Sequence, residues 1–420
     1  MISRFFFNIS IFDTLKYLFT ILFFNKKDLT NNLNGKLSTY FNDSNFYYFD
    51  HGRTALYETL CELRKKTKKE KILVNSLTLF EIINTIIYSG FKPQFVDTKV
   101  NSFETSINLN KLDTDINNIA AIIITHLNGA NKNILELKKQ IDSHNKSNEK
   151  IYLIEDCAVS FGSKINDKYV GNYGDYSFLS FNIMKNITSF TGGVLIDKKI
   201  NNINFDTSHY KLPSKINIIK KIIFVLTIQI LNSKIIFPIF FKLIKASYKY
   251  SFNFFLKKYR TDFEINIEKT FPRRFHNLMH NFQKYILLNQ FDSLETKQNL
   301  RINKSKVYYE NLKSINLLHF PQVEFNNLNI FLDFPIICEK QEIQKDLFHF
   351  LLDNKIDVKN YYYTNCSEKN IYKYDNKICS NSKKISENIL MLPLHEKINE
   401  NKQKEIISKI IEFFNNYKLK

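Results

Sequence analysis

The 420-residue sequence predicts an α/β fold, with a large domain built on a mostly parallel sheet and a smaller α+β C-terminal domain. From about residue 47, short apolar strands alternate with amphipathic helices, which is typical of a parallel sheet covered by helices. Two continuous apolar runs, "IAAIIITHLNG" and "KIYLIEDCA", indicate strands buried on both faces. A chain of this length exceeds the size at which one core stops growing, which favours two domains.

The elements follow in order along the large domain. The sequence predicts a strand in "FYYFDHG", a helix in "RTALYETLCELRKKTK", a strand in "KILVNS", a helix in "LFEIINTIIYSG", strands in "KPQFVDT" and "IAAIIITHLNG", a helix in "ILELKKQIDSHN", and a strand in "KIYLIEDCA". Gly52, His126 and Asp156 fall at strand ends, where ligands sit in parallel sheets. Beyond residue 275 we expect one long helix over residues 278–312, short strands such as "FLDFPIIC", and a terminal helix.

Two segments are apolar and dotted with lysine. The first spans residues 1–35, and the second, within residues 205–270, predicts two amphipathic helices split at Pro238. Neither contains the roughly 18 uninterrupted apolar residues of a membrane-spanning helix. Two interpretations stay open for both segments: contact with a membrane surface, or packing within the core or a dimer interface. The predicted divisions are therefore 1–35, 36–204 for the large domain, 205–270 for the insertion, and 271–420 for the small domain.

The charge and the cysteines restrict the function further. The net charge is +19, but the basic residues are scattered and no aromatic-interleaved motif accompanies them, so we expect no nucleic-acid binding. Attraction to anionic lipid is a further interpretation of this charge. The five cysteines are widely spaced without a CxxC pair, which predicts free thiols in a reducing cytoplasm and no metal site.

The stretch from residue 152 to 196 carries the chemistry. Lys185 stands in a Gly- and Ser-rich turn, and Glu155-Asp156 closes the apolar strand before it. A lysine with a depressed pKa can bond covalently to an aldehyde, and a carboxylate can pair with a protonated ring nitrogen. A helix start at Gly52-Arg53-Thr54 and the hydroxyl of Ser180 offer groups that bind phosphate. Together these are the parts that pyridoxal 5′-phosphate requires.

The motifs form an ordered set. They read "GRTAL", "NSLTL", "GFKPQFVD", "HLNG", "EDCA", "GDYSFLSFNIMK", "TGG" and, near the C-terminus, "ILMLPLHEKINENKQKEI". In this order they resemble the DegT/DnrJ/EryC1/StrS family of pyridoxal-phosphate-dependent sugar aminotransferases, over roughly residues 45–200 and 275–420. The resemblance implies an aspartate aminotransferase-like large domain of pyridoxal-phosphate fold type I.

The resemblance also assigns roles to individual residues. It implies that Lys185 carries the cofactor and then moves protons as an acid and base, and that Asp156 is the partner of the ring nitrogen. The expected phosphate contacts are Gly52, Arg53, Thr54 and Ser180, and the expected neighbours of the ring are His126 and Asn128. The family's dehydrating relatives carry His in place of the lysine, so Lys185 argues against that branch.

Three positions depart from the family pattern. Val159 stands where a Gln usually bonds the cofactor's phenolic oxygen, and Leu79, beside Phe80, stands where an aromatic ring is expected to stack. "HNLM", from His276 to Met279, replaces an Asn-x-Arg-Met motif. These departures affect cofactor contacts and substrate choice.

The resemblance implies a transaminase that moves an amino group, most often from glutamate, to a nucleotide- or lipid-linked keto-sugar for surface polysaccharide biosynthesis. It further implies a cytoplasmic homodimer, for which a peripheral contact with the inner face of the membrane stays open. The alternative is a catalytically altered cofactor-binding regulator or a membrane-surface scaffold protein.

Overall fold

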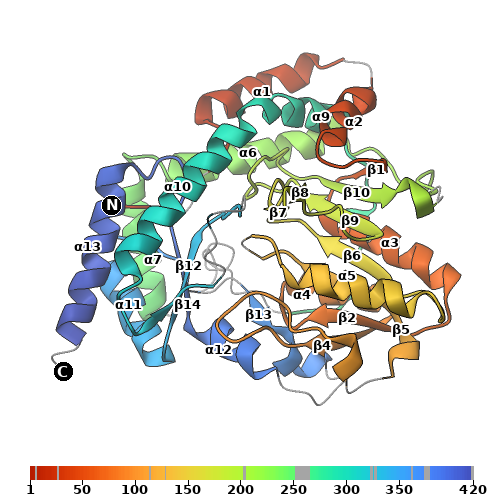
Figure 1. The fold of residues 1–420 in the computed structure, drawn as a ribbon. Coiled ribbons are helices and arrows are strands. Elements are labelled where there is room, and N and C mark those ends of the chain that lie inside the picture. Colours follow the sequence, from red (N-terminus) through yellow and green to blue (C-terminus); the bar gives the residue numbers. More distant parts are fainter. Residues whose placement is uncertain are drawn as a thin grey trace.

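A seven-stranded sheet organises the large domain in the computed structural model, which describes residues 1–4, 7–25, 28–112, 115–127, 129–201, 205–250, 265–321, 325, 329–360, 363–372 and 379–417. The strand order is β1-β10-β9-β6-β5-β2-β4 (Figure 1). The strands are β1 Ser44–Phe49, β2 Lys71–Asn75, β4 Lys92–Val96, β5 Ile119–Thr125, β6 Tyr152–Asp156, β9 Tyr176–Ser180 and β10 Gly193–Lys198. Neighbours from β4 to β9 run parallel, whereas β10 is antiparallel to β9 and β1. The predicted mostly parallel sheet is confirmed.

Helices cover both faces of this sheet because each presents one apolar stripe to it. One face packs against α3 (Gly52–Lys66) and α4 (Phe80–Tyr88). The other packs against α2 (Thr30–Ser38), α5 (Asn133–His144) and α9 (Asn281–Leu288). All seven residues of β5 are buried, as the continuous apolar run predicts.

The C-terminal part is built on a three-stranded antiparallel sheet. Its order is β11 (Leu318–His319), β12 (Phe334–Cys338) and β14 (Ile389–Leu392). The helices α10 (Leu294–Leu312), α11 (Gln341–Asp353) and α13 (Glu400–Tyr417) share its main core, and α12 (Ser380–Asn388) packs separately. The short pair β3 (Leu77–Thr78) and β13 (Thr364–Asn365) joins this part to the large domain just past β2. A further two-stranded pair comprises β7 (Lys164–Ile165) and β8 (Lys168–Tyr169).

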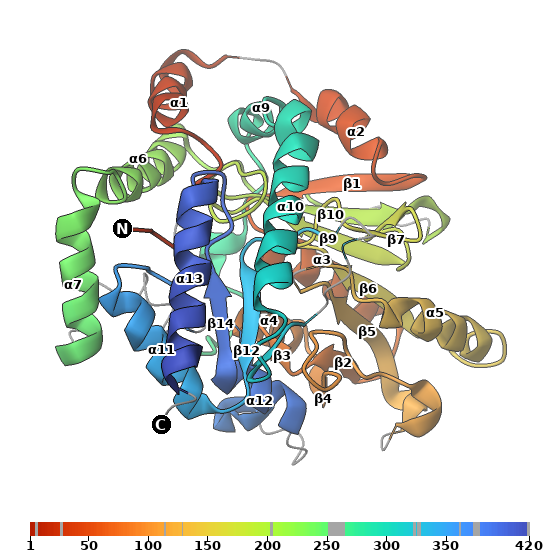
Figure 2. The same cartoon turned by 60° about the vertical axis from the view of Figure 1, so that its left-hand side comes forward.

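Three helices lie along one edge of the molecule, away from the middle of the central sheet (Figures 1 and 2). They are α1 (Ile11–Phe23), α6 (Lys215–Leu231) and α7 (Phe237–Tyr250), with α1 packed on α6. The two helices predicted for the insertion are thus confirmed, and residues 251–264 of that segment lie outside the described residues. Among the helices described, none has the length and apolar character needed to span a bilayer.

The prediction of one long helix over residues 278–312 is wrong. The chain forms α9 and α10 with a break between Leu288 and Leu294. At the break, the side-chain amide of Gln290 donates to the carbonyl oxygen of Thr188 at 2.7 Å and accepts from the Thr188 N–H at 3.1 Å. The break therefore satisfies two backbone groups in the loop that carries Lys185.

Candidate active site

The residues predicted for the site gather where the parallel strands end. Asp156 is the last residue of β6, Ser180 is the last of β9, and Gly52 opens α3. Lys185 lies in the loop between β9 and β10, whose base is closed by a hydrogen bond from the Phe181 N–H to the Gly192 carbonyl oxygen at 2.8 Å. The free ends of parallel strands leave room for such a site.

Lys185 has an unusual electrostatic setting. Burial lowers the pKa of its ammonium group to about 8, although the negative charges of Asp156 and Glu81 act in the opposite direction. The positive charge of Lys359 adds to the lowering. The residue as a whole keeps partial exposure, and an amine with a pKa of about 8 is poised to exchange a proton near neutral pH.

Asp156 is a buried carboxyl group with few partners. Burial raises its pKa, against the effects of the Ala158 N–H and of the Lys185 and His126 side chains. The Ala158 N–H donates to Oδ1 at 3.0 Å. Within the described part of the chain, this is the carboxyl group's one hydrogen bond in the structure. A cationic partner would stabilise the ionised form in this position.

The start of α3 is pressed against the end of β9. A Cβ added to Gly52 would lie 3.0 Å from the Leu179 carbonyl oxygen and 3.1 Å from the Cβ of Ser180. A Cβ added to Gly193 would lie only 2.3 Å from the carbonyl atoms of His51. The two glycines therefore permit the close approach of the helix start to Ser180, and N–H groups at a helix start next to a serine suit a phosphate.

Thr54 and Arg53 have partners within the protein. The buried Thr54 hydroxyl donates to the Phe275 carbonyl oxygen at 2.9 Å, which anchors α3 to the start of the C-terminal part. The Arg53 guanidinium donates to Glu81 Oε1 at 3.2 Å and lies 4.5 Å from the centre of the Phe275 ring. Arg53 thus links α3 to α4 at the edge of the site.

His126 is buried and both of its ring nitrogens are engaged. Nδ1 accepts from the Asn131 N–H at 2.9 Å, so Nε2 carries the proton that it shares with Glu155 at 3.0 Å. Glu155 also accepts from the N–H groups of Gly171, Tyr173 and Gly174. Burial opposes the ionisation of Glu155, but the hydrogen bonds from His126 and from these N–H groups outweigh burial and lower the pKa of Glu155.

Cys157 completes a buried group with His126 and Glu155 whose donor atoms lie within 4.8 Å of one another, close enough to hold a metal ion. Because Glu155 already accepts four hydrogen bonds, the group is satisfied as a hydrogen-bonded support. All five cysteines are free, as predicted. Asn128, expected near the ring, lies outside the described residues.

The departures from the family pattern have visible consequences. Val159 is buried in an apolar cluster and has no polar atom to bond a phenolic oxygen. Leu79 is the N-cap of α4 and keeps 40% of its side chain exposed, with Phe80 partly buried beside it. Leu79 offers apolar surface, but no ring, where a stacking aromatic was expected.

The sequence motifs missed several residues around Lys185. Asn8 donates from Nδ2 to the carbonyl oxygens of Lys185 and, at 2.8 Å, Asn186. Glu81 and Lys359 act on Lys185 by charge, and Lys359 is paired with Asp333. None of them stands in a motif, and only the strongly polar character of Glu81 within an apolar helix gave any signal.

The fold is of the aspartate aminotransferase-like type, pyridoxal-phosphate fold type I. The structure aligns with a putative sugar aminotransferase, Spr1654 from Streptococcus pneumoniae in its PMP form, at a TM-score of 0.73 and 16% identity over 99% of this chain and 98% of that one. The chain belongs to the DegT/DnrJ/EryC1/StrS aminotransferase family, whose model matches residues 23–202 and 267–411.

Two curated relatives give the range of similarity. GDP-perosamine synthase of Escherichia coli O157:H7 is 33% identical over 147 residues, which cover 35% of this chain and 38% of that protein. dTDP-4-amino-4,6-dideoxy-D-glucose transaminase of Shigella dysenteriae is 22% identical over 397 residues, 92% of each chain. The match to GDP-perosamine synthase has the higher identity but spans well under half of that protein. The match to the Shigella transaminase has the lower identity and spans nearly all of it.

Proposed function

We propose that the protein is a pyridoxal-phosphate-dependent aminotransferase that moves an amino group, from glutamate, to a keto-sugar. The observation that carries this proposal is the pair formed by Lys185, with its pKa lowered to about 8, and the buried Asp156 at the ends of the parallel strands. Membership of the aminotransferase family supports it. The sugar transaminases among the relatives support a nucleotide-linked acceptor in surface polysaccharide biosynthesis, and a lipid-linked acceptor is the second possibility.

The residues present fit this cofactor. Among the described residues the Asp156 carboxyl group has one hydrogen bond and no ion pair, so it could accept the proton of a pyridine nitrogen, and Gly52 sets the start of α3 directly against Ser180. When bound, pyridoxal 5′-phosphate supplies an aldehyde and an electron-accepting ring. We assign Lys185 as the group that binds the aldehyde, and Gly52 and Ser180 as the phosphate contacts.

The chain's own residues would then hold and move protons. Asp156 keeps a proton on the ring nitrogen through its carboxylate, and Lys185 Nζ accepts and returns the proton that moves between substrate and cofactor carbons. Thr54 and Arg53 fix the helix start, through Phe275 and Glu81, and Arg53 borders the phosphate cradle. We assign His126 to the support of Glu155, because both of its ring nitrogens are engaged.

An absorbance scan with and without glutamate tests the proposed function. The purified protein should show the violet absorbance band of the cofactor bound to a lysine, and glutamate should shift that band into the near ultraviolet. Borohydride reduction followed by peptide mapping should mark Lys185, and Lys185→Arg should abolish the shift while the protein stays folded. A band that glutamate leaves unchanged would instead favour a cofactor-binding regulator, and absence of any band would refute the proposal.

The location and assembly of the protein are also proposals. We propose a cytoplasmic homodimer in peripheral contact with the inner face of the membrane. The five free cysteines and the apolar, lysine-dotted helices α1, α6 and α7 support this placement. Light scattering on the purified protein tests the dimer. The divisions 1–35, 36–204, 205–270 and 271–420 are likewise proposed, with the seven-stranded sheet drawn from residues 44–198 and the three-stranded sheet from residues 318–392.

A further inference from the structure

Exposed apolar side chains concentrate on helices that the family model does not match. That model begins at residue 23 and leaves out residues 203–266, so α1, α6 and α7 are additions. On α1, the side chains of Phe12, Phe19 and Phe23 are 77%, 65% and 86% exposed. On the turn after α6 and on α7, Ile235 and Ile239 are 87% and 67% exposed.

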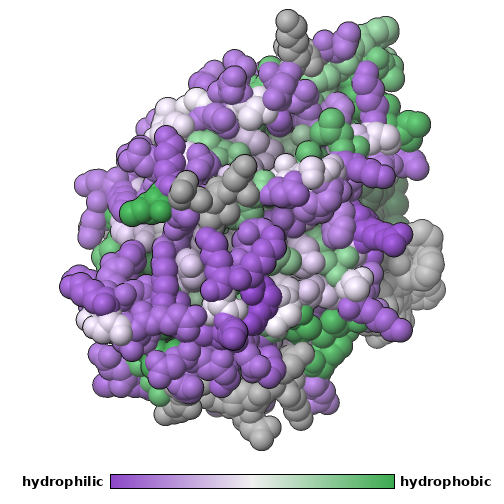
Figure 3. Space-filling view, turned by 90° about the vertical axis from the view of Figure 1, so that its right-hand side faces the viewer, coloured by the Kyte–Doolittle hydropathy of each residue, from purple (hydrophilic) through white to green (hydrophobic). Residues whose placement is uncertain are grey.

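These side chains lie on three helices that follow one another along the chain's added segments, and we call this part of the surface the α1–α6–α7 edge. Its exposed large apolar residues are Phe12, Leu15, Phe19, Leu22, Phe23, Ile216, Ile223, Phe224, Ile230, Ile235, Ile239 and Leu243. The face drawn in Figure 3 is mostly hydrophilic, with one group of hydrophobic side chains at its upper right and smaller groups elsewhere. An apolar region of this extent on a protein surface marks an interaction site.

The same edge is strongly basic. Residues 207–250 contain eight lysines and no Asp or Glu. Lys220, Lys234 and Lys242 are exposed, and no ion pair to them occurs within the part of the chain that the structure describes. The apolar region therefore has a rim of uncompensated positive charge.

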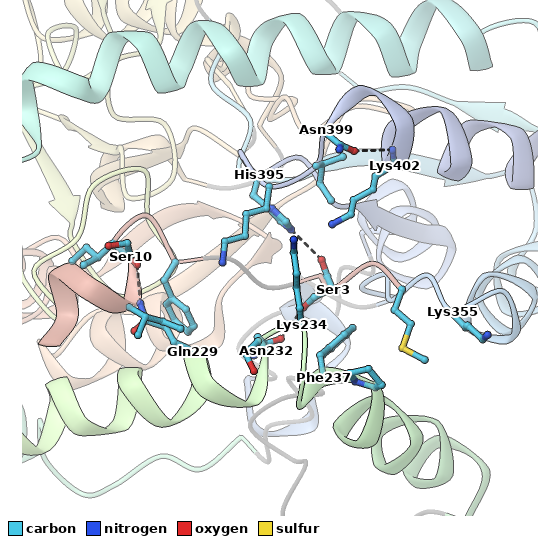
Figure 4. Close-up of a pocket in the computed structure, with 18 residues that line it drawn as sticks. Ser3, Ser10, Gln229, Asn232, Lys234, Phe237, Lys355, His395, Asn399 and Lys402 are labelled. Carbon is cyan, nitrogen blue, oxygen red and sulfur yellow. Dashed lines mark hydrogen bonds between the residues drawn. The ribbon is translucent and has the colours of Figure 1, made fainter.

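A cavity of about 830 Å³ opens where α1 begins, α6 ends and α7 begins (Figure 4). Its lining includes Lys234, Lys355, Lys397 and Lys402, and the described lining contains no acidic residue. In Figure 4, Lys234 extends from the α6–α7 turn toward His395, and the amine of Lys402 points toward the same space. Lys355 lies at the margin. Several ammonium groups around one cavity are the chemistry that recognises a phosphate.

One of the lining residues also carries a buried polar atom that lacks a hydrogen-bond partner in the described part of the chain. Gln229 lines it, and its Nε2 donates to the Ile9 carbonyl oxygen at 2.7 Å. Its Oε1 is buried and has no hydrogen-bond partner among the residues that the structure describes. An orphaned acceptor of this kind suits a hydroxyl or amine donor, such as the polar end of a phospholipid headgroup.

We propose that the α1–α6–α7 edge docks on an anionic phospholipid bilayer and that the cavity between Lys234 and Lys402 takes the phosphate of a lipid headgroup. The inference deepens the peripheral location proposed above and does not depend on the transaminase activity. The apolar side chains beside the cavity, Ile235 next to Lys234 and Ile239 on the first turn of α7, then enter the boundary between headgroups and acyl chains.

Charge complementarity favours a bilayer over a second copy of the chain. An isologous contact would bring two lysine-rimmed surfaces together on molecules that each carry +19. An anionic leaflet attracts the same lysines at about 1 kcal/mol for each one held near its surface. A membrane of anionic lipid can bury the apolar side chains and at the same time neutralise the charge of the lysines.

Vesicle flotation tests the proposal with matched variants of the full chain. Vesicles of phosphatidylcholine, with or without phosphatidylglycerol, are mixed with wild-type protein, the cavity pair Lys234→Gln/Lys402→Gln, or the apolar pair Phe19→Ser/Phe23→Ser. The control pair, Lys139→Gln/Lys146→Gln, removes the same charge from exposed positions on and just after α5. Light scattering and the absorbance scan are run on each variant, and calorimetry with soluble glycerol phosphate tests a free phosphate as ligand.

The wild-type protein should float with phosphatidylglycerol vesicles, and binding should weaken as salt increases. The cavity pair should bind about 30-fold more weakly, the apolar pair about 100-fold more weakly, and the control pair close to normally. Equal losses in the cavity and control pairs would overturn the headgroup site, and so would glycerol phosphate binding as tightly as the vesicles. If the protein does not float and the apolar pair converts a dimer into a monomer, the edge is an interface between two copies of the chain. A normal absorbance shift in any of these cases would leave the transaminase proposal standing.

Discussion

Lys185 in the cofactor-free protein should react with acetic anhydride at a much lower pH than surface lysines do. Its pKa is lowered to about 8 from 10.5, chiefly by burial. Since only the neutral amine reacts, about 10% of Lys185 but only about 0.03% of an ordinary lysine is reactive at pH 7. The neutral fraction of Lys185 at pH 7 is thus about 300-fold larger than that of an ordinary lysine, so Lys185 should be labelled at a pH where surface lysines remain largely unreacted.

Glu81→Gln is the perturbation that tests the cause. The carboxylate of Glu81 raises the pKa of Lys185, against the larger effect of burial, and it also pairs with Arg53. Removing the negative charge should move the midpoint of Lys185 labelling to lower pH. Glu70→Gln is the matched control, because Glu70 pairs with Lys92 on the surface and does not act on Lys185.

Competitive labelling followed by mass spectrometry of the peptide that contains Lys185 gives the midpoint directly. The wild-type protein should show a midpoint near 8, with the control variant unchanged. A midpoint near 10 in the wild-type protein would refute the buried-lysine reasoning, and an upward shift in Glu81→Gln would refute the assigned sign.

Three further predictions concern the same residues and one distant ion pair. Lys185→Met should raise the melting temperature of the cofactor-free protein at pH 7, and the gain should fade between about pH 8 and 10.5. The reason is that the unfolded chain binds the Lys185 proton more tightly than the folded one over that window, so wild-type stability rises with pH there. Asp156→Ala should weaken cofactor binding, measured by fluorescence titration, and a variant with near-normal affinity would contradict the ring-nitrogen assignment. Asp357→Ala should lower the free energy of unfolding in urea by about 3–5 kcal/mol, because it leaves the buried guanidinium of Arg4 without the carboxylate that lies 2.5 Å away.

Strands buried on both faces were predictable from the sequence, whereas their order was not. The run that became β5 is almost entirely apolar and the one that became β6 is apolar up to Glu155, and that signal is local. The place of β10 between β1 and β9 depends on pairing across about 150 residues of chain, for which no local pattern exists. The break between α9 and α10 escaped prediction because Gln290 bonds to Thr188, a partner a hundred positions away.

The same distinction applies to the candidate site. Lys185, Asp156, Gly52 and Ser180 were found because each stands in a short motif with its own chemical logic. Three other residues act on Lys185 from distant parts of the chain: Glu81 on α4, Lys359 in the C-terminal part and Asn8 in the N-terminal segment. A single sequence does not show that these residues lie near Lys185. The sequence also did not show that Thr54 bonds to Phe275 or that His126 bonds to Glu155 and Asn131. Because of these bonds we assign both residues to supporting the site.

The N-terminal segment links the lysine loop to the cavity at the α1–α6–α7 edge. Asn8 holds the carbonyl oxygens of Lys185 and Asn186, while its neighbours Phe7 and Ile9 line the cavity. Residues 7–9 therefore contact both the Lys185 loop and the cavity, although they precede the region that the family model matches. A truncation of residues 1–24 would take two hydrogen bonds from the Lys185 loop together with the whole of α1. Substitution of the exposed Phe19 and Phe23 changes the apolar surface of α1 without touching the residues that line the cavity or bond to the Lys185 loop.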